Sequence, residues 1–303
     1  MLISLNEARE RLDQLKSLFD PCRLCPRGCK AHRIVNQVGV CKAGSQIRIA
    51  SWASHRGEEP PISGFNGSGT IFVSHCPMKC IYCQNYPFSQ LGTGKDLTKP
   101  ELVRLFEKLI SDKVHNLNLV SPTHYIVQLL EAFLELPPEL QKTPLVYNTS
   151  GYENIDVIRL LDGIIDIYLP DIRYSDDQFS FQFSRAPDYV KANRETICEM
   201  ARQVGELVVD ESGIAKRGLI VRHLVLPNDR AGTKSSLLWL KEKIGTKVQL
   251  SLMSQYFPAY KAKNSPELNR KITFEEYQEA LDYVEELGFE NVWAQDPTID
   301  GFA

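Results

Sequence analysis

The sequence predicts an α/β fold in which a partial (βα)6 TIM-like barrel follows a small N-terminal Cys-rich module. Beyond residue 69, short apolar runs alternate with helical patterns about six times, which indicates parallel strands with helices on the outside. Between residues 20 and 60 that alternation is missing, and the segment is irregular and rich in Cys, Gly and Pro. We therefore predict two domains: residues 1–60, a helix and a metal-binding module, and residues 61–303, the barrel.

The expected elements can be placed along the chain from the period of the apolar residues. A helix over 4–19 carries its apolar side chains on one face. The expected strands cover residues 70–73, 117–120, 145–147, 164–169, 219–221 and 248–252. The expected helices that alternate with them cover residues 102–110, 125–133, 157–161, 188–204, 234–243 and 274–287. Two helices begin with capping boxes, formed by Thr98 with Glu101 and by Thr273 with Glu276.

The composition excludes several classes of protein. With 303 residues and a formal net charge of -3, the chain lacks the basic excess that a nucleic-acid-binding protein shows. No apolar run approaches the roughly 20 residues that a membrane helix needs. The first residues lack the charged start and the apolar stretch of a signal peptide. We therefore expect a cytoplasmic protein with no nucleic-acid or membrane partner.

Three of the eight cysteines form a C-x3-C-x2-C motif directly after the first expected barrel strand: Cys76, Cys80 and Cys83. A loop at the carboxyl end of a barrel strand lies on the face where barrel enzymes place their chemistry. Three thiolates can hold a [4Fe-4S] cluster and leave one iron open for a substrate, as a catalytic metal keeps an open position. The alternative is a structural zinc site with His75 as the fourth ligand, but neighbouring residues on an extended strand point opposite ways.

Four further cysteines lie close together in the N-terminal module: Cys22, Cys25, Cys29 and Cys41. Because disulfides are disfavoured in the cytosol, two such clusters point to metal. Four thiolates can close a tetrahedral zinc site or bind a second [4Fe-4S] cluster, and the sequence does not choose between these; thiols that only pack or form disulfides are the remaining alternative. Cys198 is expected in the core of a helix. The basic residues of the module, which we interpret as a solvated face, are Arg23, Arg27, Lys30, His32 and Arg33.

The second cysteine group carries a resemblance to a known family. A C-x3-C-x-aromatic-C motif after the first strand of a βα barrel resembles the signature of radical S-adenosylmethionine (SAM) enzymes. The resemblance implies a [4Fe-4S] cluster on the three cysteines and SAM on its open iron. It also implies an external one-electron reductant and cleavage of SAM to a 5′-deoxyadenosyl radical, which takes hydrogen from a substrate. By the same resemblance, Tyr82 lies near the adenine of SAM.

Within that superfamily, residues 69–295 resemble most closely the pyruvate formate-lyase activating enzymes and their uncharacterised relatives. Those activators remove a hydrogen from a backbone glycine of a partner enzyme. Four short motifs carry the resemblance: C-Q-N, Y-N-T-S-G, D-I-Y-L-P-D-I-R and V-R-H-L-V-L-P. The residues that these motifs place near SAM are Asn85, Asn148, Asp171 and Arg222.

The chain also departs from the activating enzymes. Where they have a G-G-E motif that contacts the amino end of SAM, this chain reads V-S-P-T-H over residues 120–124. Pro122 cannot donate an N–H, so the amino-group contacts must differ. Asn148 replaces an aspartate and Arg173 replaces a lysine. The residues that we expect to contribute instead are Ser121, Thr123 and His124.

The sequence therefore predicts a radical SAM oxidoreductase with an unidentified substrate, and no side chain is assigned a catalytic role. The leading hypothesis is an enzyme similar to the activating enzymes, with a protein as its substrate. The second is a radical SAM enzyme that modifies a small molecule or another peptide. The third is a non-catalytic metal-binding protein that uses the barrel as a scaffold.

Overall fold

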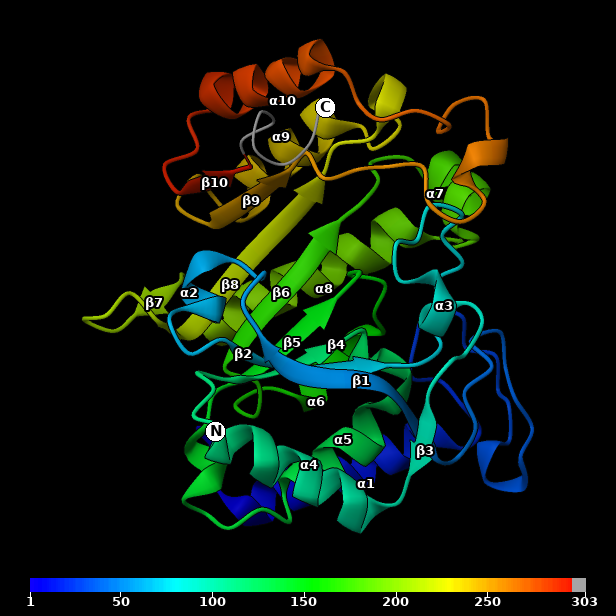
Figure 1. The fold of residues 1–303 in the computed structure, drawn as a ribbon, viewed down its shortest axis with the longest axis vertical. Helices are drawn as coiled ribbons and strands as arrows, with labels where there is room; N and C mark the ends of the chain where they lie inside the picture. Colours follow the sequence, from blue (N-terminus) through cyan, green and yellow to red (C-terminus); the bar gives the residue numbers. More distant parts are fainter. Residues whose placement is uncertain (296–303) are drawn as a thin grey trace.

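The structure, a computed structural model, describes residues 1–295, and its centre is one open, mostly parallel sheet (Figure 1). The strands are β1 (Ile47–His55), β2 (Ser68–Val73), β3 (Lys95–Leu97), β4 (Leu117–Val120), β5 (Leu145–Thr149), β6 (Ile167–Ile172), β7 (Val208–Val209), β8 (Ala215–Leu224), β9 (Gln249–Met253) and β10 (Val292–Ala294). Their order is β10-β9-β8-β6-β5-β4-β2-β1-β3, with β7 beside β8. Neighbours from β10 to β2 run parallel, and β1 is antiparallel to β2 and β3. The predicted α/β class with a mostly parallel sheet is confirmed.

The structure places a strand inside residues 20–60, a segment predicted to be irregular. β1 pairs with β2 through its backbone, although most of its side chains are exposed. A strand that is held mainly by backbone hydrogen bonds does not need alternating apolar and polar residues. The search for that alternation therefore did not find β1. The predicted domain boundary at residue 60 stays a prediction. It lies five residues after the end of β1, which is a strand of the main sheet. Residues 296–303 of the second predicted domain lie outside the described residues.

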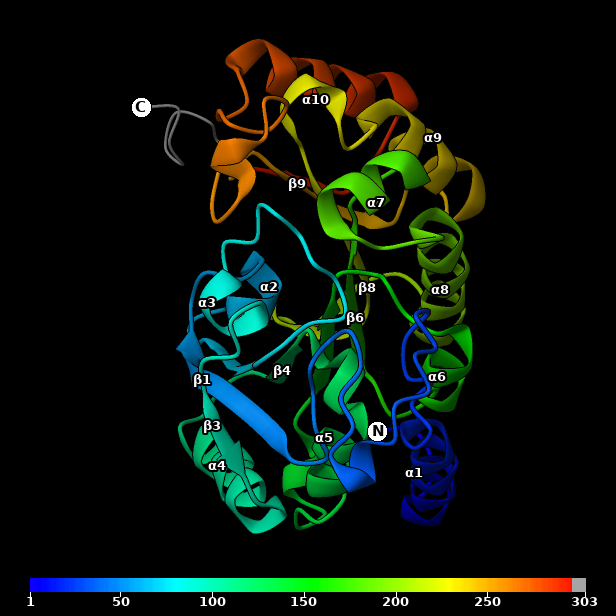
Figure 2. The same ribbon diagram turned by 90° about the vertical axis from the view of Figure 1, so that its right-hand side faces the viewer.

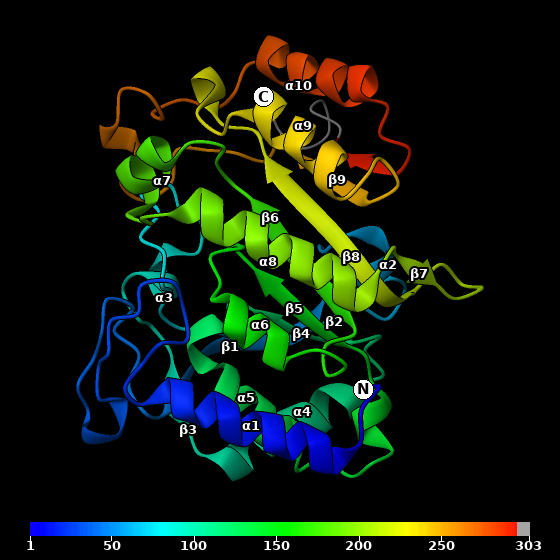
Figure 3. The ribbon, with the colours of Figure 1, turned by 180° about the vertical axis from the view of Figure 1, so that it is seen from behind.

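Helices cover the outer face of the sheet, as Figures 2 and 3 show for α1, α6 and α8. The helices are α1 (Leu5–Phe19), α2 (Pro60–Ser63), α3 (Tyr86–Ser89), α4 (Lys99–Ser111), α5 (Ile126–Phe133), α6 (Ile155–Leu160), α7 (Asp177–Ser184), α8 (Tyr189–Val204), α9 (Thr233–Lys243) and α10 (Phe274–Leu287). The capping boxes predicted at the starts of α4 and α10 are both present. Among residues 1–295 no helix has the length and apolar character that crossing a membrane requires.

One helix contradicts its own sequence pattern. The sequence of α7, D-Q-F-S-F-Q-F-S, alternates apolar and polar residues as a strand does. It is helical because the Asp176 side chain accepts a hydrogen bond from the Gln178 N–H at 2.7 Å, which caps the helix start. Stacking of the Phe179 and Phe183 rings, one helical turn apart, adds to this. Local capping therefore outweighs the period of the apolar residues here.

The sheet has a separate core on each face. On β5, Leu145 and Tyr147 belong to the large core between sheet and helices, whereas Val146 faces inward. The inward core is small and fully buried, and it consists of Ile62, Val146, Ile167, Leu169, Ala215 and Ile220. Ile62 belongs to α2, so this short helix packs against the inward face of the sheet. Burying an isoleucine completely contributes about 2 kcal/mol, so this contact fixes the segment between β1 and β2.

The N-terminal module is attached to the sheet domain by two arginines predicted to lie on a solvated face. Arg33 is instead buried: its guanidinium donates to the carbonyls of Gly44 and His124 at 2.6 Å each and packs over the ring of Phe19. A buried guanidinium is tolerated because these carbonyls and rings replace its water. Arg27 donates to the carbonyl of Pro77 at 2.5 Å, next to the first cysteine of the second group.

Candidate functional site

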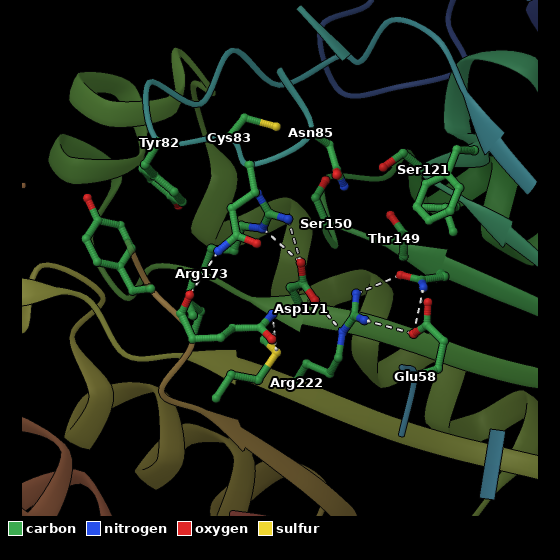
Figure 4. A pocket seen from close by; sticks show the side chains of 18 residues that line it. Glu58, Tyr82, Cys83, Asn85, Ser121, Thr149, Ser150, Asp171, Arg173 and Arg222 are labelled. Carbon is green, nitrogen blue, oxygen red and sulfur yellow. Dashed lines mark hydrogen bonds and ion pairs between the residues drawn. The ribbon is translucent and has the colours of Figure 1, made fainter. Parts of the chain in front are cut away.

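A pocket of about 190 Å³ opens at the carboxyl ends of the parallel strands (Figure 4). The five residues predicted to contact SAM line it together with one motif cysteine: Tyr82, Asn85, Asn148, Asp171, Arg222 and Cys83. They come from the loop after β2 and from the ends of β5, β6 and β8. Parallel strands bring these ends to one edge of the sheet, which is how residues far apart in the sequence meet.

The polar wall of the pocket is centred on Asp171. Arg222, its direct neighbour across the β6–β8 pair, donates from Nε to Asp171 Oδ1 at 2.8 Å and from Nη2 to Asn148 Oδ1 at 2.6 Å. Arg173 donates from Nε and Nη2 to Asp171 Oδ2 at 2.9 and 2.6 Å. Burial alone would raise the pKa of Asp171, but the two guanidinium groups outweigh it and lower the pKa below its ordinary value. Asp171 is therefore an ionised carboxylate shared by two cations.

Arg173 also reaches the cysteine motif, a contact that no sequence pattern indicated. Its Nη1 donates to Cys80 Sγ at 3.3 Å, and the Ser184 hydroxyl donates to the same sulfur at 3.0 Å. The Ser184 oxygen lies 2.6 Å from the hydroxyl of Tyr174, which lies 2.7 Å from that of Tyr82. Donors of this kind stabilise the negative charge of a sulfur that binds a metal.

The motif cysteines lie on a loop that its backbone holds in place. The Lys79 N–H donates to the carbonyl of Ser184 at 2.8 Å, which ties the loop to the end of α7. Cys76 and Cys80 are buried, and Cys83 is half-buried at the pocket wall. Burial is the main cause that raises the pKa of Cys76 to about 12, followed by the charges of Cys80 and Cys83. The three sulfurs therefore lie within reach of one another's charge.

This arrangement fits a cluster better than a single ion. Within residues 1–295, no three side chains of His, Cys, Asp or Glu are grouped so as to hold one metal ion. Thiolates of a [4Fe-4S] cluster bind different iron atoms, so their sulfurs need not converge on one point, whereas those of a structural zinc ion must. His75, the alternative fourth zinc ligand, has a left-handed backbone (φ 71°) rather than the extended one assumed for it, and its ring lies against Gly92.

The first cysteine group lies near the second. Arg27, between Cys25 and Cys29, donates a hydrogen bond to the carbonyl of Pro77, which follows Cys76. Cys22, Cys25 and Cys41 are buried, and Cys29 is exposed. Burial raises the pKa of Cys22, and the neighbouring Cys29 and Cys41 raise it further. The same holds for Cys25, where Cys41 and Cys22 add to the effect of burial. The charges of neighbouring thiols thus reach Cys22 and Cys25, although no three metal-ligating side chains of residues 1–295 are grouped so as to hold a single ion.

Of the three residues expected to replace the G-G-E contacts, only Ser121 lines the pocket. It follows β4 directly and has a left-handed backbone, with φ 55°. Thr123 donates to Glu153 at 2.6 Å, and His124 Nε2 lies 2.8 Å from the carbonyl oxygen of Ser74. Both side chains are therefore committed to contacts outside the pocket.

Sequence reasoning missed Glu58, which lines the pocket from the segment between β1 and α2. Its Oε2 lies 3.6 Å from Arg222 Nη1 and 3.5 Å from Asn148 Nδ2. Burial raises the pKa of Glu58 to about 7, and the charge of Arg222 only partly offsets this. The available signal was weak: two adjacent glutamates before two prolines, in a segment taken as irregular.

Glu153, just after β5, is a further buried carboxylate that the sequence did not reveal. It accepts hydrogen bonds from the hydroxyls of Thr123 at 2.6 Å, Tyr147 at 3.0 Å and Thr149. Burial raises its pKa to about 7, although these hydroxyls act in the opposite direction. Thr149 lines the pocket, so the Glu153 network fixes part of the pocket wall.

The comparisons with known proteins agree with an iron-sulfur site. Residues 64–179, less than half of the chain, match the family described as "4Fe-4S single cluster domain", and this range contains the second cysteine group. An uncharacterised protein of Methanocaldococcus jannaschii, MJ0674, is 26% identical over 291 residues, which cover 93% of this chain and 80% of that protein.

Two solved structures are similar in chain path. SuiB of Streptococcus suis, bound to S-adenosylmethionine, aligns with a TM-score of 0.46 and 11% identity over 73% of this chain. HydG, a maturase of the [FeFe]-hydrogenase, aligns with a TM-score of 0.45 and 12% identity over 96% of this chain. The chain spans only 48% of SuiB and 63% of HydG.

Replacing Glu153 with Gln should make the stability of the protein less dependent on pH. A carboxyl whose pKa rises from 4.5 to about 7 on folding contributes stability below pH 4.5, and this contribution is lost as the pH rises through 7. The loss is on the order of 3 kcal/mol. We expect Glu153→Gln to exceed the wild type in stability at pH 8 by more than at pH 5. Urea unfolding at both pH values measures this, and a wild-type pH dependence in the variant would contradict it.

Proposed function

We propose that this chain is a radical SAM enzyme that holds a [4Fe-4S] cluster on Cys76, Cys80 and Cys83. The observation that carries the proposal is a three-cysteine loop whose third cysteine lines the same pocket as the Arg222–Asp171 pair. The family match over residues 64–179 supports the cluster. When bound, the cluster and SAM supply the one-electron cleavage of SAM and the hydrogen abstraction that follows.

The residues of the chain bind and position these groups. Arg222 and Asn148 present a guanidinium and an amide to the pocket, and we assign them to the amino-acid end of SAM. The buried ring of Tyr82, fixed through its hydroxyl, is assigned to the adenine. Asn85 lines the pocket two residues beyond the last motif cysteine and is assigned to SAM as well. Asp171 keeps both arginines in place.

The proposed substrate is a protein, as for the activating enzymes that the motifs resemble. The departures at residues 120–124 and at Asn148 favour a second candidate, a small molecule or a peptide other than a glycine loop. The enzyme is further proposed to use an external one-electron reductant, to be cytoplasmic and to have no nucleic-acid or membrane partner. Its open sheet is proposed to be a partial (βα)6 barrel.

We assign a separate metal, zinc or a second [4Fe-4S] cluster, to Cys22, Cys25, Cys29 and Cys41. The support is that the four cysteines lie close together in the sequence, in a module without regular secondary structure between α1 and β1 apart from one short turn of helix. Such a module gains much of its folding free energy from metal. Because Arg27 connects this module to the second cysteine loop, the proposed metal would lie near the proposed cluster.

Anaerobically reconstituted protein should contain iron and sulfide for one cluster on the second cysteine group. With a strong reductant and SAM, it should release 5′-deoxyadenosine. Cys80→Ala should lose about four iron atoms per chain and all release. Cys198→Ala is the matched control, because Cys198 is exposed on α8 rather than in a helix core as predicted. If wild-type protein with a full cluster releases no 5′-deoxyadenosine, the enzyme proposal falls and a non-catalytic metal-binding protein takes its place.

Arg222→Ala and Asp171→Ala should each weaken SAM binding by about tenfold or more, because charge-assisted hydrogen bonds to the ligand or to its binding arginine are lost. The dissociation constant is measured by calorimetry on protein with its cluster, and the iron content per chain serves as the test of integrity. Arg202→Ala, an exposed arginine on α8, is the control and should bind SAM as the wild type does. Unchanged affinity in both pocket variants would mean that SAM binds elsewhere.

The Cys22→Ala/Cys25→Ala double variant should lose the N-terminal metal and unfold at a lower temperature, because metal binding stabilises the module. The metals bound per chain are counted by elemental analysis, which also decides between zinc and iron. The cluster on the second group should remain, as seen from its visible absorption. Wild-type metal content and melting temperature in the double variant would refute a structural metal here.

A further inference from the structure

Two buried carboxylates beside the pocket lack close partners. The side chains of Glu58 and Glu59 are only 10% and 8% exposed. Glu58 Oε2 lies 3.5 Å from Asn148 Nδ2 and 3.6 Å from Arg222 Nη1, and the Glu59 Oε1 atom lies 3.9 Å from Arg222 Nε. Within residues 1–295, Glu59 Oε2 is buried with no hydrogen-bond partner at all. Contacts of this length are too long for good hydrogen bonds, and a buried carboxylate without donors is costly.

Among the described residues, the cation that Glu58 and Glu59 contact is Arg222, which already has close partners. Arg222 makes its short hydrogen bonds to Asp171 at 2.8 Å and to Asn148 at 2.6 Å. Arg173, the second arginine, is directed to Asp171 and to the sulfur of Cys80. Three carboxyl groups therefore face two guanidinium groups, and those of Glu58 and Glu59 have the longest contacts to them.

The carboxylates border a cavity of about 230 Å³ that adjoins the SAM pocket. The two spaces share four lining residues: Glu58, Arg222, Met253 and Gln255. Trp293 on β10 also lines this cavity, so an aromatic side chain contributes to its wall beside the two carboxyl groups. A molecule that occupied this cavity could therefore extend one end into the SAM pocket.

An organic cation fits this cavity better than a metal ion. Among residues 1–295, two carboxyl groups line this cavity, those of Glu58 and Glu59. Within the described chain no set of three metal-ligating side chains is found here. An ammonium carries three donors, which matches two carboxylates with unfilled acceptor positions, and its carbon chain matches Met253 and Trp293.

We infer that the cavity bordered by Glu58, Glu59 and Trp293 is a substrate subsite for a primary ammonium group. That the bound molecule is a substrate rests on the proposed function. In that case SAM occupies the adjoining pocket, and the ammonium group orients the substrate so that one of its carbon–hydrogen bonds faces SAM. The binding itself requires only the two glutamates. It restricts the substrate to molecules or peptides with an amine a short distance from the reacting carbon.

The test uses reconstituted full-length protein, with n-butylammonium as the probe and n-butanol as its neutral isostere. Ligand-detected NMR under anaerobic conditions measures both dissociation constants, with and without saturating SAM. We expect butylammonium to bind at least about tenfold more tightly than butanol, because a charge-assisted hydrogen bond contributes about that much. Saturating SAM should leave the affinity for butylammonium unchanged. Equal binding of the two probes would overturn the inference without the use of any variant.

Glu59→Gln keeps the shape of the side chain and removes its charge, so it should weaken butylammonium binding about tenfold and leave SAM binding within twofold. Glu10→Gln, an exposed glutamate on α1, is the control and should change neither. Unchanged butylammonium binding in Glu59→Gln would overturn the inference. A second pair of results would also overturn it: SAM competes with butylammonium, and Glu59→Gln binds SAM more weakly. SAM's own amino group would then be the group that contacts the two glutamates. Selective ammonium binding in protein that never cleaves SAM would retain the cation site and reject the proposed function.

Discussion

The site depends on one buried carboxylate, that of Asp171. It holds Arg222 at the pocket wall and Arg173 at the cysteine loop, with four short polar contacts between them and their neighbours. Breaking a buried ion pair leaves an uncompensated charge, and this lowers the free energy of unfolding by roughly 3 to 5 kcal/mol. Removal of this carboxylate would leave two such charges. The polar wall of the pocket and the environment of Cys80 are thus parts of a single electrostatic unit.

The cysteine loop is coupled to its surroundings in a similar way. Its backbone is tied to the end of α7, and Cys80 receives donors from Arg173 and Ser184. On its other side Arg27 links it to the N-terminal module, which Arg33 in turn anchors to the sheet domain. The two cysteine groups therefore form one region, although 35 positions separate Cys41 from Cys76. A metal in the first group would stabilise the segment on which the second depends.

The segment between β1 and β2 contributes both apolar and charged groups. Ile62 on α2 fills the inward core of the sheet, and this contact holds the preceding Glu58 and Glu59 against Arg222. Burial of these carboxylates is thus a consequence of packing a few residues away. Burial of the Ile62 side chain stabilises this segment, whereas burial of the two carboxyl groups destabilises it.

Local sequence determined the features that depend on local physics. Periodicity and capping located the six parallel strands from β2 to β9 and most of the longer helices, and the cysteine spacings located both thiol groups. Motif resemblance selected Asp171 and Arg222, which line the pocket together. Only the tertiary structure decided the partners of charged groups: Arg173 with Cys80, 93 positions apart, or Arg33 with the carbonyl of His124, 91 apart. It also decided the strand β1 and the place of Glu58 and Glu59. Such contacts arise from sheet register and from packing between distant segments, and neither leaves a period or spacing in the sequence around a single residue.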